Sequence, residues 1–183
     1  MHDFIREYQI SKELCEELII HFHTSMNKRP GECGRGVDLN VKRSTDSEFT
    51  DLDTGYGKLY HDALMKCVDA YCDEYPFAEF YCEFSAVEPI RLQWYKPGES
   101  FRLYHCERGS VESSMRHLVF MTYLNDIDVG GETEFYHQQL KVKPETGKTL
   151  IWPSDWTFTH RGVVAPHEHK YIVTGWLSFP PPP

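Results

Sequence analysis

The second half of the chain consists of short segments with the composition of β-strands, and this pattern restricts the fold more than any other feature. Each segment is rich in β-branched and aromatic residues, and Gly, Pro or Asp separates it from the next. Many short strands joined by such turns are typical of a sandwich or a jelly roll. The predicted strands are residues 90–95, 117–125, 132–136, 139–143, 149–152, 157–162 and 171–179.

The first half of the chain predicts two helices instead. Ser11 is a suitable N-cap for a helix that runs to about Thr24, with apolar residues at helical spacing along it. A second helix is predicted over residues 57–75, where Pro76 ends it. Residues 3–10 are expected to enter the fold as a short extended segment. We expect both helices to pack against the outside of the β-sheet and to support it.

A polar stretch rich in turn-forming residues, residues 27–55, lies between the two helices. Apolar and polar residues alternate over Val37–Val41, which predicts a short strand inside this stretch. A long irregular stretch in a compact domain is often a lid or a binding loop. A disordered surface loop explains the same composition equally well, so both interpretations stay open.

The length of 183 residues predicts one domain, with residues 1–85 as helical support, 86–179 as the jelly-roll core and 180–183 as a polyproline tail. We find neither an apolar run long enough to span a membrane nor a signal peptide at the start. Six scattered cysteines then indicate reduced thiols and a cytoplasmic protein. The net charge of −9 opposes a broad surface for nucleic acid. The sequence does not indicate an oligomeric state.

Two histidines and one carboxylate form a candidate metal site. His105 and Glu107 are two residues apart, so on an extended strand their side chains point to the same face while Cys106 points away. His160 would have to arrive from another strand. Two imidazoles and a carboxylate are the facial triad of non-haem iron(II) oxygenases, which leaves open positions on the metal.

The residues around this triad resemble those of the 2-oxoglutarate/Fe(II) oxygenases, specifically the prolyl 4-hydroxylase-like branch. The similarity covers about residues 88–179 and is carried by the order and spacing of short motifs. These motifs are Tyr95-Lys96-Pro97-Gly98 with Phe101 before His105, then Thr122-Tyr123-Leu124-Asn125, Gly130-Gly131-Glu132-Thr133, and Pro144, Gly147, Leu150 and Ile151 leading to His160, with Lys170 ten residues later.

The resemblance implies a double-stranded β-helix of the jelly-roll or cupin type, mainly β within the α+β class, and it assigns roles to several residues. Lys170 would bind the distal carboxylate of 2-oxoglutarate, with hydroxyl groups from Tyr123 and Thr133 beside it. Tyr95 would lie nearer the chelating end. Trp176 would back the site, and Arg161 would face the substrate. A buried aromatic core residue remains the alternative for each tyrosine, and solvated surface charge the alternative for Arg161.

Two departures from the family pattern concern the metal ligands. Glu107 stands where the family usually has aspartate, and its extra methylene requires the carboxylate to fold back or the strand to shift. One extra residue lies between Gly98 and His105, which predicts a small bulge that re-aims the ligand pair.

The implied activity is hydroxylation of an unactivated C–H bond, with a peptidyl proline of a peptide or protein substrate as the leading candidate. Fe(II), 2-oxoglutarate and dioxygen would be required, ascorbate is a further candidate cofactor, and succinate and CO2 would be released. The same chemistry on a free amino acid or a nucleobase is an alternative, although the acidic chain disfavours nucleic acid. A jelly-roll metal-binding module without turnover is a third, non-enzymatic alternative.

Overall fold

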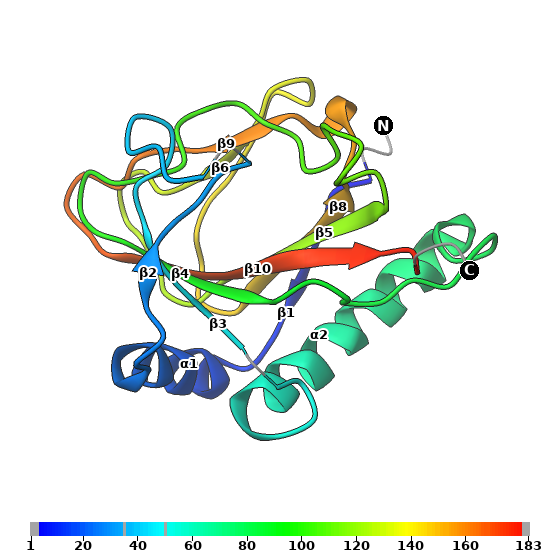
Figure 1. Ribbon diagram of the computed structural model, residues 1–183, viewed down its shortest axis with the longest axis horizontal. Coiled ribbons are helices and arrows are strands. Elements are labelled where there is room, and N and C mark those ends of the chain that lie inside the picture. The colour runs from blue at the N-terminus through cyan, green and yellow to red at the C-terminus, as the bar shows by residue number, and fades with distance from the viewer. Residues whose placement is uncertain (1–3, 35, 50, 181–183) are drawn as a thin grey trace.

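A computed structural model describes residues 4–34, 36–49 and 51–180, and within these ranges the fold is built on two opposed β-sheets (Figure 1). The larger sheet has the strand order β1-β8-β5-β10-β4-β3-β2, and the smaller sheet has the order β7-β6-β9. Pairing between neighbouring strands is antiparallel. The strands are β1 (Arg6–Gln9), β2 (Arg29–Pro30), β3 (Thr45–Glu48), β4 (Arg91–Tyr95), β5 (Arg116–Tyr123), β6 (Thr133–Phe135), β7 (Leu140–Val142), β8 (Lys148–Pro153), β9 (His160–Gly162) and β10 (Lys170–Ser178).

Two helices cover the outer face of the larger sheet, as predicted (Figure 1). Helix α1 (Lys12–Thr24) begins after Ser11, whose hydroxyl accepts a hydrogen bond from the Leu14 amide at 3.1 Å. Helix α2 (Gly55–Glu74) is followed by a short 3₁₀ helix, η1 (Pro76–Ala78). Neither helix is long and apolar enough to cross a membrane, and the same holds for every helix within the described ranges.

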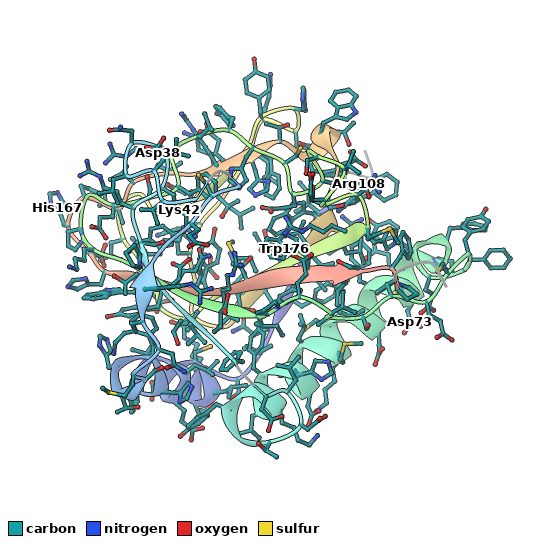
Figure 2. All side chains as sticks on the ribbon, viewed as in Figure 1. Asp38, Lys42, Asp73, Arg108, His167 and Trp176 are labelled. Atoms are coloured by element: carbon teal, nitrogen blue, oxygen red, sulfur yellow. The ribbon has the colours of Figure 1, made fainter. Side chains whose placement is uncertain are left out.

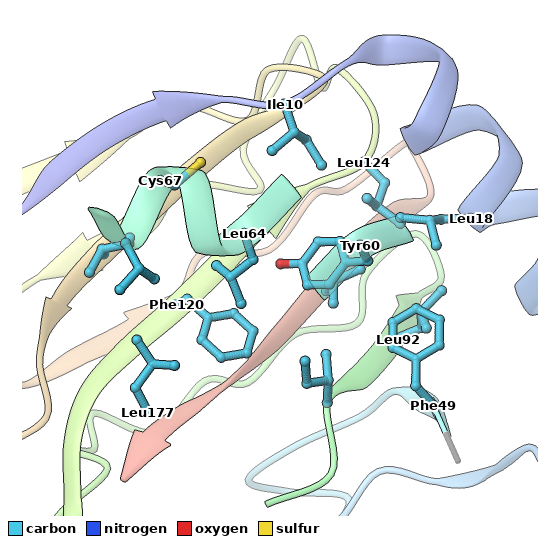
Figure 3. Packing of buried hydrophobic residues seen from close by; sticks show 14 of the residues in the cluster. Ile10, Leu18, Phe49, Tyr60, Leu64, Cys67, Leu92, Phe120, Leu124 and Leu177 are labelled. Carbon is cyan, nitrogen blue, oxygen red and sulfur yellow. The ribbon is translucent and has the colours of Figure 1, made fainter. Parts of the chain in front are cut away.

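Side chains along the central strands point alternately to the two faces of the larger sheet, so the interior has one core on each face. Leu118 and Phe120 of β5 pack in the core with the helices. Figure 3 shows Phe120 beside Tyr60 of α2 in this core. Val119 and Met121 point the other way and pack with side chains of the smaller sheet. This is the period-two pattern of a sheet that is covered on both faces. The helix face therefore carries structural packing, and the opposite face is available for a site.

The stretch between the helices contains two short strands that its composition did not indicate. It contributes β2 and β3, which extend the larger sheet beyond β4. The strand predicted at Val37–Val41 is wrong, because this segment is a turn in which the carbonyl of Asp38 accepts hydrogen bonds from the amides of Val41 and Lys42. Whether the remainder of residues 27–55 acts as a lid stays a prediction.

Two further sequence-based boundaries differ from the structure. The strand predicted over residues 157–162 begins only at His160, because the Asp155 side chain caps the 3₁₀ helix η2 (Trp156–Phe158) through the amide of Thr157. Of the predicted polyproline tail, residues 181–183 lie outside the described ranges. The antiparallel strands, the two opposed sheets and the supporting helices confirm the mainly β, α+β jelly-roll class.

Candidate active site

A cavity of about 810 Å³ lies against the face of the larger sheet that the helices do not cover. This volume falls within the usual range for ligand pockets in proteins. Residues of both sheets line the cavity, as do Glu32, Cys33 and Lys42 from the stretch between the helices. Eight of the nine sequence-predicted site residues are among the lining residues: Tyr95, His105, Glu107, Thr133, His160, Arg161, Lys170 and Trp176.

The three predicted metal ligands converge at one end of this cavity. The Oε1 atom of Glu107 lies 3.3 Å from Nε2 of His105 and 3.5 Å from Nε2 of His160. One ligand atom from each residue lies within 4.8 Å of the other two. His160 opens β9, and two backbone hydrogen bonds of 2.9 Å join it to His105. The regular strand expected at residues 105–107 is absent, and this single bridge holds the segment instead.

Hydrogen bonding fixes both imidazole rings in the form that can bind a metal. Nδ1 of His105 contacts the carbonyl of Leu103 at 2.8 Å, and Nδ1 of His160 contacts the carbonyl of Phe158 at 2.9 Å. Because a carbonyl only accepts, each Nδ1 carries a hydrogen, and Nε2 is the ring nitrogen left to bind a metal. Both Nε2 atoms face the carboxylate of Glu107. A backbone carbonyl that orients a ligand histidine in this way is common at metal sites.

The protonation states of these groups also suit a metal. Burial alone would raise the pKa of Glu107, but hydrogen bonds and charge interactions with His105 and His160 hold it well below its usual range. Burial lowers the pKa of His160. An ionised carboxylate and neutral imidazole nitrogens are the donors that iron(II) accepts, so the residues present fit this ion.

Lys170 lies at the start of β10 and carries a buried, unneutralised ammonium group. Its Nζ donates to the carbonyl of Gly131 at 2.7 Å and lies 5.2 Å and 5.8 Å from the ring centroids of Tyr123 and Tyr95. No carboxylate lies within ion-pairing distance of Nζ among the described residues. Burial lowers the pKa of Lys170 to about 8, against the opposing charge of Glu132. A buried cation of this kind favours an anionic ligand.

The turn that supplies the carbonyl to Lys170 depends on two glycines. Gly130 and Gly131 have φ values of +77° and +76°, which side chains disfavour. A Cβ atom on Gly130 would lie 2.1 Å from the carbonyl oxygen of Val164. The Gly-Gly pair therefore serves a tight turn that places a backbone oxygen beside the buried ammonium.

Tyr123 is the predicted site residue that does not line the cavity. Its hydroxyl accepts a hydrogen bond from the amide of Thr133 at 3.0 Å and lies 2.7 Å from the Thr133 hydroxyl. It also donates to the carbonyl of Val142 at 3.1 Å. These contacts orient Thr133, which does line the cavity, so the structure places Tyr123 behind Thr133.

A buried polar network near Tyr95 was missed by the sequence analysis. The Tyr95 hydroxyl donates to Oε1 of Gln93 at 2.7 Å. Beside it, the side chains of Lys42 and Asp46 form an ion pair of 2.8 Å, and both are almost fully buried. Ser44 donates to the other oxygen of Asp46 at 2.6 Å. Lysine and serine in a polar loop give no sequence signal for burial, because the pairing depends on tertiary contacts.

The two residues predicted on the substrate side have definite partners. Nε of Arg161 donates to Glu134 at 2.7 Å, and its guanidinium lies 4.4 Å from the centroid of the Tyr104 ring. Trp176 lies on β10 and packs in the core between the two sheets (Figure 2). Its indole donates to Oε2 of Glu107 at 2.8 Å. Trp176 is thus a direct neighbour of the candidate metal ligand.

Comparison with known families accounts for this arrangement. Residues 90–178, which include all nine predicted site residues, match the family model described as the 2OG-Fe(II) oxygenase superfamily. The chain is therefore an oxidoreductase that uses Fe(II), 2-oxoglutarate and dioxygen. No curated protein sequence matches it.

Solved structures with the same fold include three prolyl hydroxylases, each less than a fifth identical in sequence. A viral collagen prolyl hydroxylase from Paramecium bursaria Chlorella virus-1, in complex with 2-oxoglutarate, has a TM-score of 0.71 at 18% identity and covers 97% of both chains. A Pseudomonas putida prolyl-4-hydroxylase has a TM-score of 0.74 at 16% identity and covers 96% of this chain and 93% of its own. A Trichoplax adhaerens prolyl hydroxylase, in complex with a peptide fragment of hypoxia inducible factor, has a TM-score of 0.77 at 17% identity. The match covers 97% of this chain and 84% of the Trichoplax chain.

Proposed function

We propose that this protein hydroxylates a peptidyl proline in a reaction that converts 2-oxoglutarate to succinate and CO2. The observation that carries the proposal is the presence of the His105, Glu107 and His160 cluster and the unneutralised Lys170 in one cavity. A site that bound only a metal would need the His105, Glu107 and His160 cluster but not Lys170. A cavity that also contains a buried cation fits a metal and a dicarboxylate together.

Each group in the cavity has a proposed role. His105, Glu107 and His160 would hold the iron, and Lys170 would pair with the distal carboxylate of 2-oxoglutarate. The hydroxyl of Thr133, oriented by Tyr123, would donate to that same carboxylate. When bound, iron and 2-oxoglutarate supply the activation of dioxygen and the oxidation of the substrate C–H bond.

The remaining lining residues would exclude water and receive the substrate. Met121, Trp152 and Ile172 provide apolar walls around the site. Tyr95 would stand closer to the metal-chelating end of the co-substrate than Lys170 does. Arg161 and Trp176 would meet the substrate at the open side. Water exclusion strengthens the electrostatic contacts within the site.

A peptide is favoured over a nucleic acid by the charges around the cavity. The three lining arginines have carboxylate partners: Arg91 pairs with Glu48, Arg116 with Glu88, and Arg161 with Glu134. Paired guanidinium groups offer little to a phosphate backbone, and the net charge is −9. The fold shared with prolyl hydroxylases, one of them solved with a peptide, favours proline as the target residue.

The same proposal treats the chain as one oxygenase domain. Residues 1–85 would support the sheet through the helices and provide the loop that reaches the cavity, and residues 86–179 would form the catalytic core. Residues Glu32, Cys33 and Lys42 line the cavity, which supports a substrate-covering role for their loop.

The proposal is tested by incubating the iron-loaded protein with 2-oxoglutarate and panels of proline-containing peptides, free amino acids and oligonucleotides. We expect succinate release and a mass gain of one oxygen in a peptide, localised to proline by fragmentation. Oxygen gain only in a free amino acid or a nucleobase would contradict the peptide assignment. A protein that binds iron but forms no succinate under any of these conditions would be a metal-binding module.

The pKa of Lys170 predicts how co-substrate binding depends on pH. Because the pKa of the empty site is about 8, the ammonium loses its proton above that pH. A bound carboxylate raises the pKa, so the dissociation constant for 2-oxoglutarate should increase by up to about tenfold per pH unit above pH 8. The tyrosines that face Lys170 stay neutral in this range, because burial raises the pKa of both Tyr95 and Tyr123 above 10.

Anaerobic titration of the iron(II) protein with 2-oxoglutarate at pH 7 to 9.5, read by the metal-to-ligand charge-transfer band, measures this dependence. The Lys170→Arg variant is the matched control, because arginine stays charged and its titration should vary little with pH. Equal pH dependence in the wild type and in Lys170→Arg would mean that a group other than Lys170 titrates in this range.

A further inference from the structure

The two oxygens of the Glu107 carboxylate lie in different environments. Oε1 faces the Nε2 atoms of His105 and His160. Oε2 points away from them, accepts the hydrogen bond from the indole of Trp176 at 2.8 Å, and lies 3.7 Å from Nη1 of Arg116. The carboxylate therefore offers one oxygen to the histidine pair while the protein retains the other.

Arg116 is itself held in place by several contacts. Its guanidinium makes two hydrogen bonds to Glu88, of 2.8 Å and 2.6 Å, in the fork geometry that arginine allows. Its central carbon lies 3.5 Å from the centroid of the Trp176 ring, so the two planar groups are in contact. Its Nη1 atom also donates to the backbone carbonyl of Glu107 at 3.0 Å. Arg116 thus contacts both the main chain of Glu107 and the indole that binds its side chain.

A sheet irregularity lies at this position. The pairing between β5 and β10 shifts between Leu177 and Ser178, where Ser178 pairs with Arg116 at the start of β5. Bulges of this kind re-aim side chains, and they occur often beside active sites. Trp176 lies two residues before Ser178 on the same strand, so the shift brings the guanidinium and the indole together.

We infer that Arg116 is a positioning residue that, through Trp176 and the Glu107 backbone, holds Glu107 so that a single carboxylate oxygen reaches the metal. The inference rests on the proposed iron site and concerns how that site uses a glutamate. Glutamate has one more rotatable bond than aspartate, so its carboxylate needs more external support to keep one orientation. Arg116, Trp176 and Glu88 provide that support from the outer side of the ligand.

The test uses Co(II) as a spectroscopic probe of the metal-free protein. We expect Arg116→Gln to weaken Co(II) binding by about ten- to a hundredfold, the effect seen when outer contacts to metal ligands are lost. The visible absorption of bound Co(II) should also change, because a released carboxylate can bind through both oxygens. Arg116→Lys should restore only part of the Co(II) affinity. Lysine keeps the positive charge but cannot make the two parallel hydrogen bonds to Glu88 or stack on the Trp176 ring.

Two comparisons separate this role from a general loss of structure. Arg91→Gln is the matched control, because Arg91 also lies over the Trp176 ring, at 5.4 Å, and forms an ion pair, with Glu48. It should leave Co(II) affinity unchanged. In the Glu107→Asp background the effect of Arg116→Gln should shrink to about threefold or less, because coupled residues give non-additive effects. If Arg116→Gln does not fold, Glu88→Gln should shift the affinity in the same direction by a smaller factor.

The outcomes distinguish this inference from the proposed function. Wild-type affinity and an unchanged Co(II) spectrum in Arg116→Gln would overturn the positioning role while leaving the metal site intact. An equal loss in the wild-type and Glu107→Asp backgrounds would also overturn it, because that pattern indicates general destabilisation. Failure of the wild-type protein to bind Co(II) or iron(II) would instead contradict the proposed function.

Discussion

Replacing either histidine of the triad, as His105→Ala or His160→Ala, is expected to abolish iron(II) binding and the decarboxylation of 2-oxoglutarate. Each imidazole supplies one of three donor atoms, and each ring is already oriented by a carbonyl on its Nδ1 side. Loss of one donor leaves two, too few for the facial arrangement that iron(II) oxygenases use. Anaerobic equilibrium dialysis with iron(II) and a succinate assay measure the two effects.

His137→Ala is the matched control, because His137 is exposed and does not line the cavity. It should bind iron as the wild type does. At the third ligand, Glu107→Asp should keep measurable activity because a carboxylate remains, whereas Glu107→Ala should lose most of it. Full iron binding and turnover in His105→Ala or His160→Ala would contradict the triad assignment, and wild-type turnover in Glu107→Ala would remove Glu107 from it.

The second large effect is expected at the co-substrate anchor. Lys170→Ala should raise the dissociation constant for 2-oxoglutarate by at least about a hundredfold. Removing one partner of a buried charge pair typically costs about 3–5 kcal/mol, which corresponds to a factor of roughly a hundred to several thousand. Iron should still bind, because its three ligands are untouched. Titration of the anaerobic iron(II) protein with 2-oxoglutarate measures the change.

Lys170→Arg should recover part of this affinity, limited by the larger planar head of arginine in a closely packed site. Lys66→Ala is the control for loss of one positive charge, because Lys66 is exposed on α2, on the far side of the sheet. Its titration curve should match that of the wild type. An unchanged curve for Lys170→Ala would show that a different residue holds the carboxylate.

The parts of the fold that could be predicted are those whose sequence pattern is local. The strands of the second half are indicated by β-branched and aromatic residues between turns, and both helices by apolar spacing. Strand β3 carries no such signal, because Thr45–Glu48 is entirely polar. Its buried Asp46 is tolerated only because Lys42 and Ser44 satisfy the carboxylate. The turn at Val37–Val41 has the alternation of a strand, but local hydrogen bonds to Asp38 determine its conformation.

The candidate site shows the same limit. His105, Glu107, His160 and Lys170 could be placed because their spacing follows a family pattern along the chain. Arg116 could not be placed, because its contacts are with residues 9, 28 and 60 positions away in the sequence, on Glu107, Glu88 and Trp176. The hydroxyl of Tyr123 could be predicted to lie near the co-substrate, but only the three-dimensional contacts show that Thr133 occupies the position in front of it.

The two-faced construction of the central strands has a consequence for how such a protein can change over generations. Along β5, Leu118 and Phe120 face the helices while Val119 and Met121 face the cavity side. Substitutions on the two faces share few partners, so their effects on free energy should add rather than interact. Stabilising replacements under the helices could therefore raise the free energy of unfolding. The protein could then tolerate destabilising replacements around the cavity and stay folded. Such a scaffold can acquire new substrates without redesigning the layer that keeps it folded.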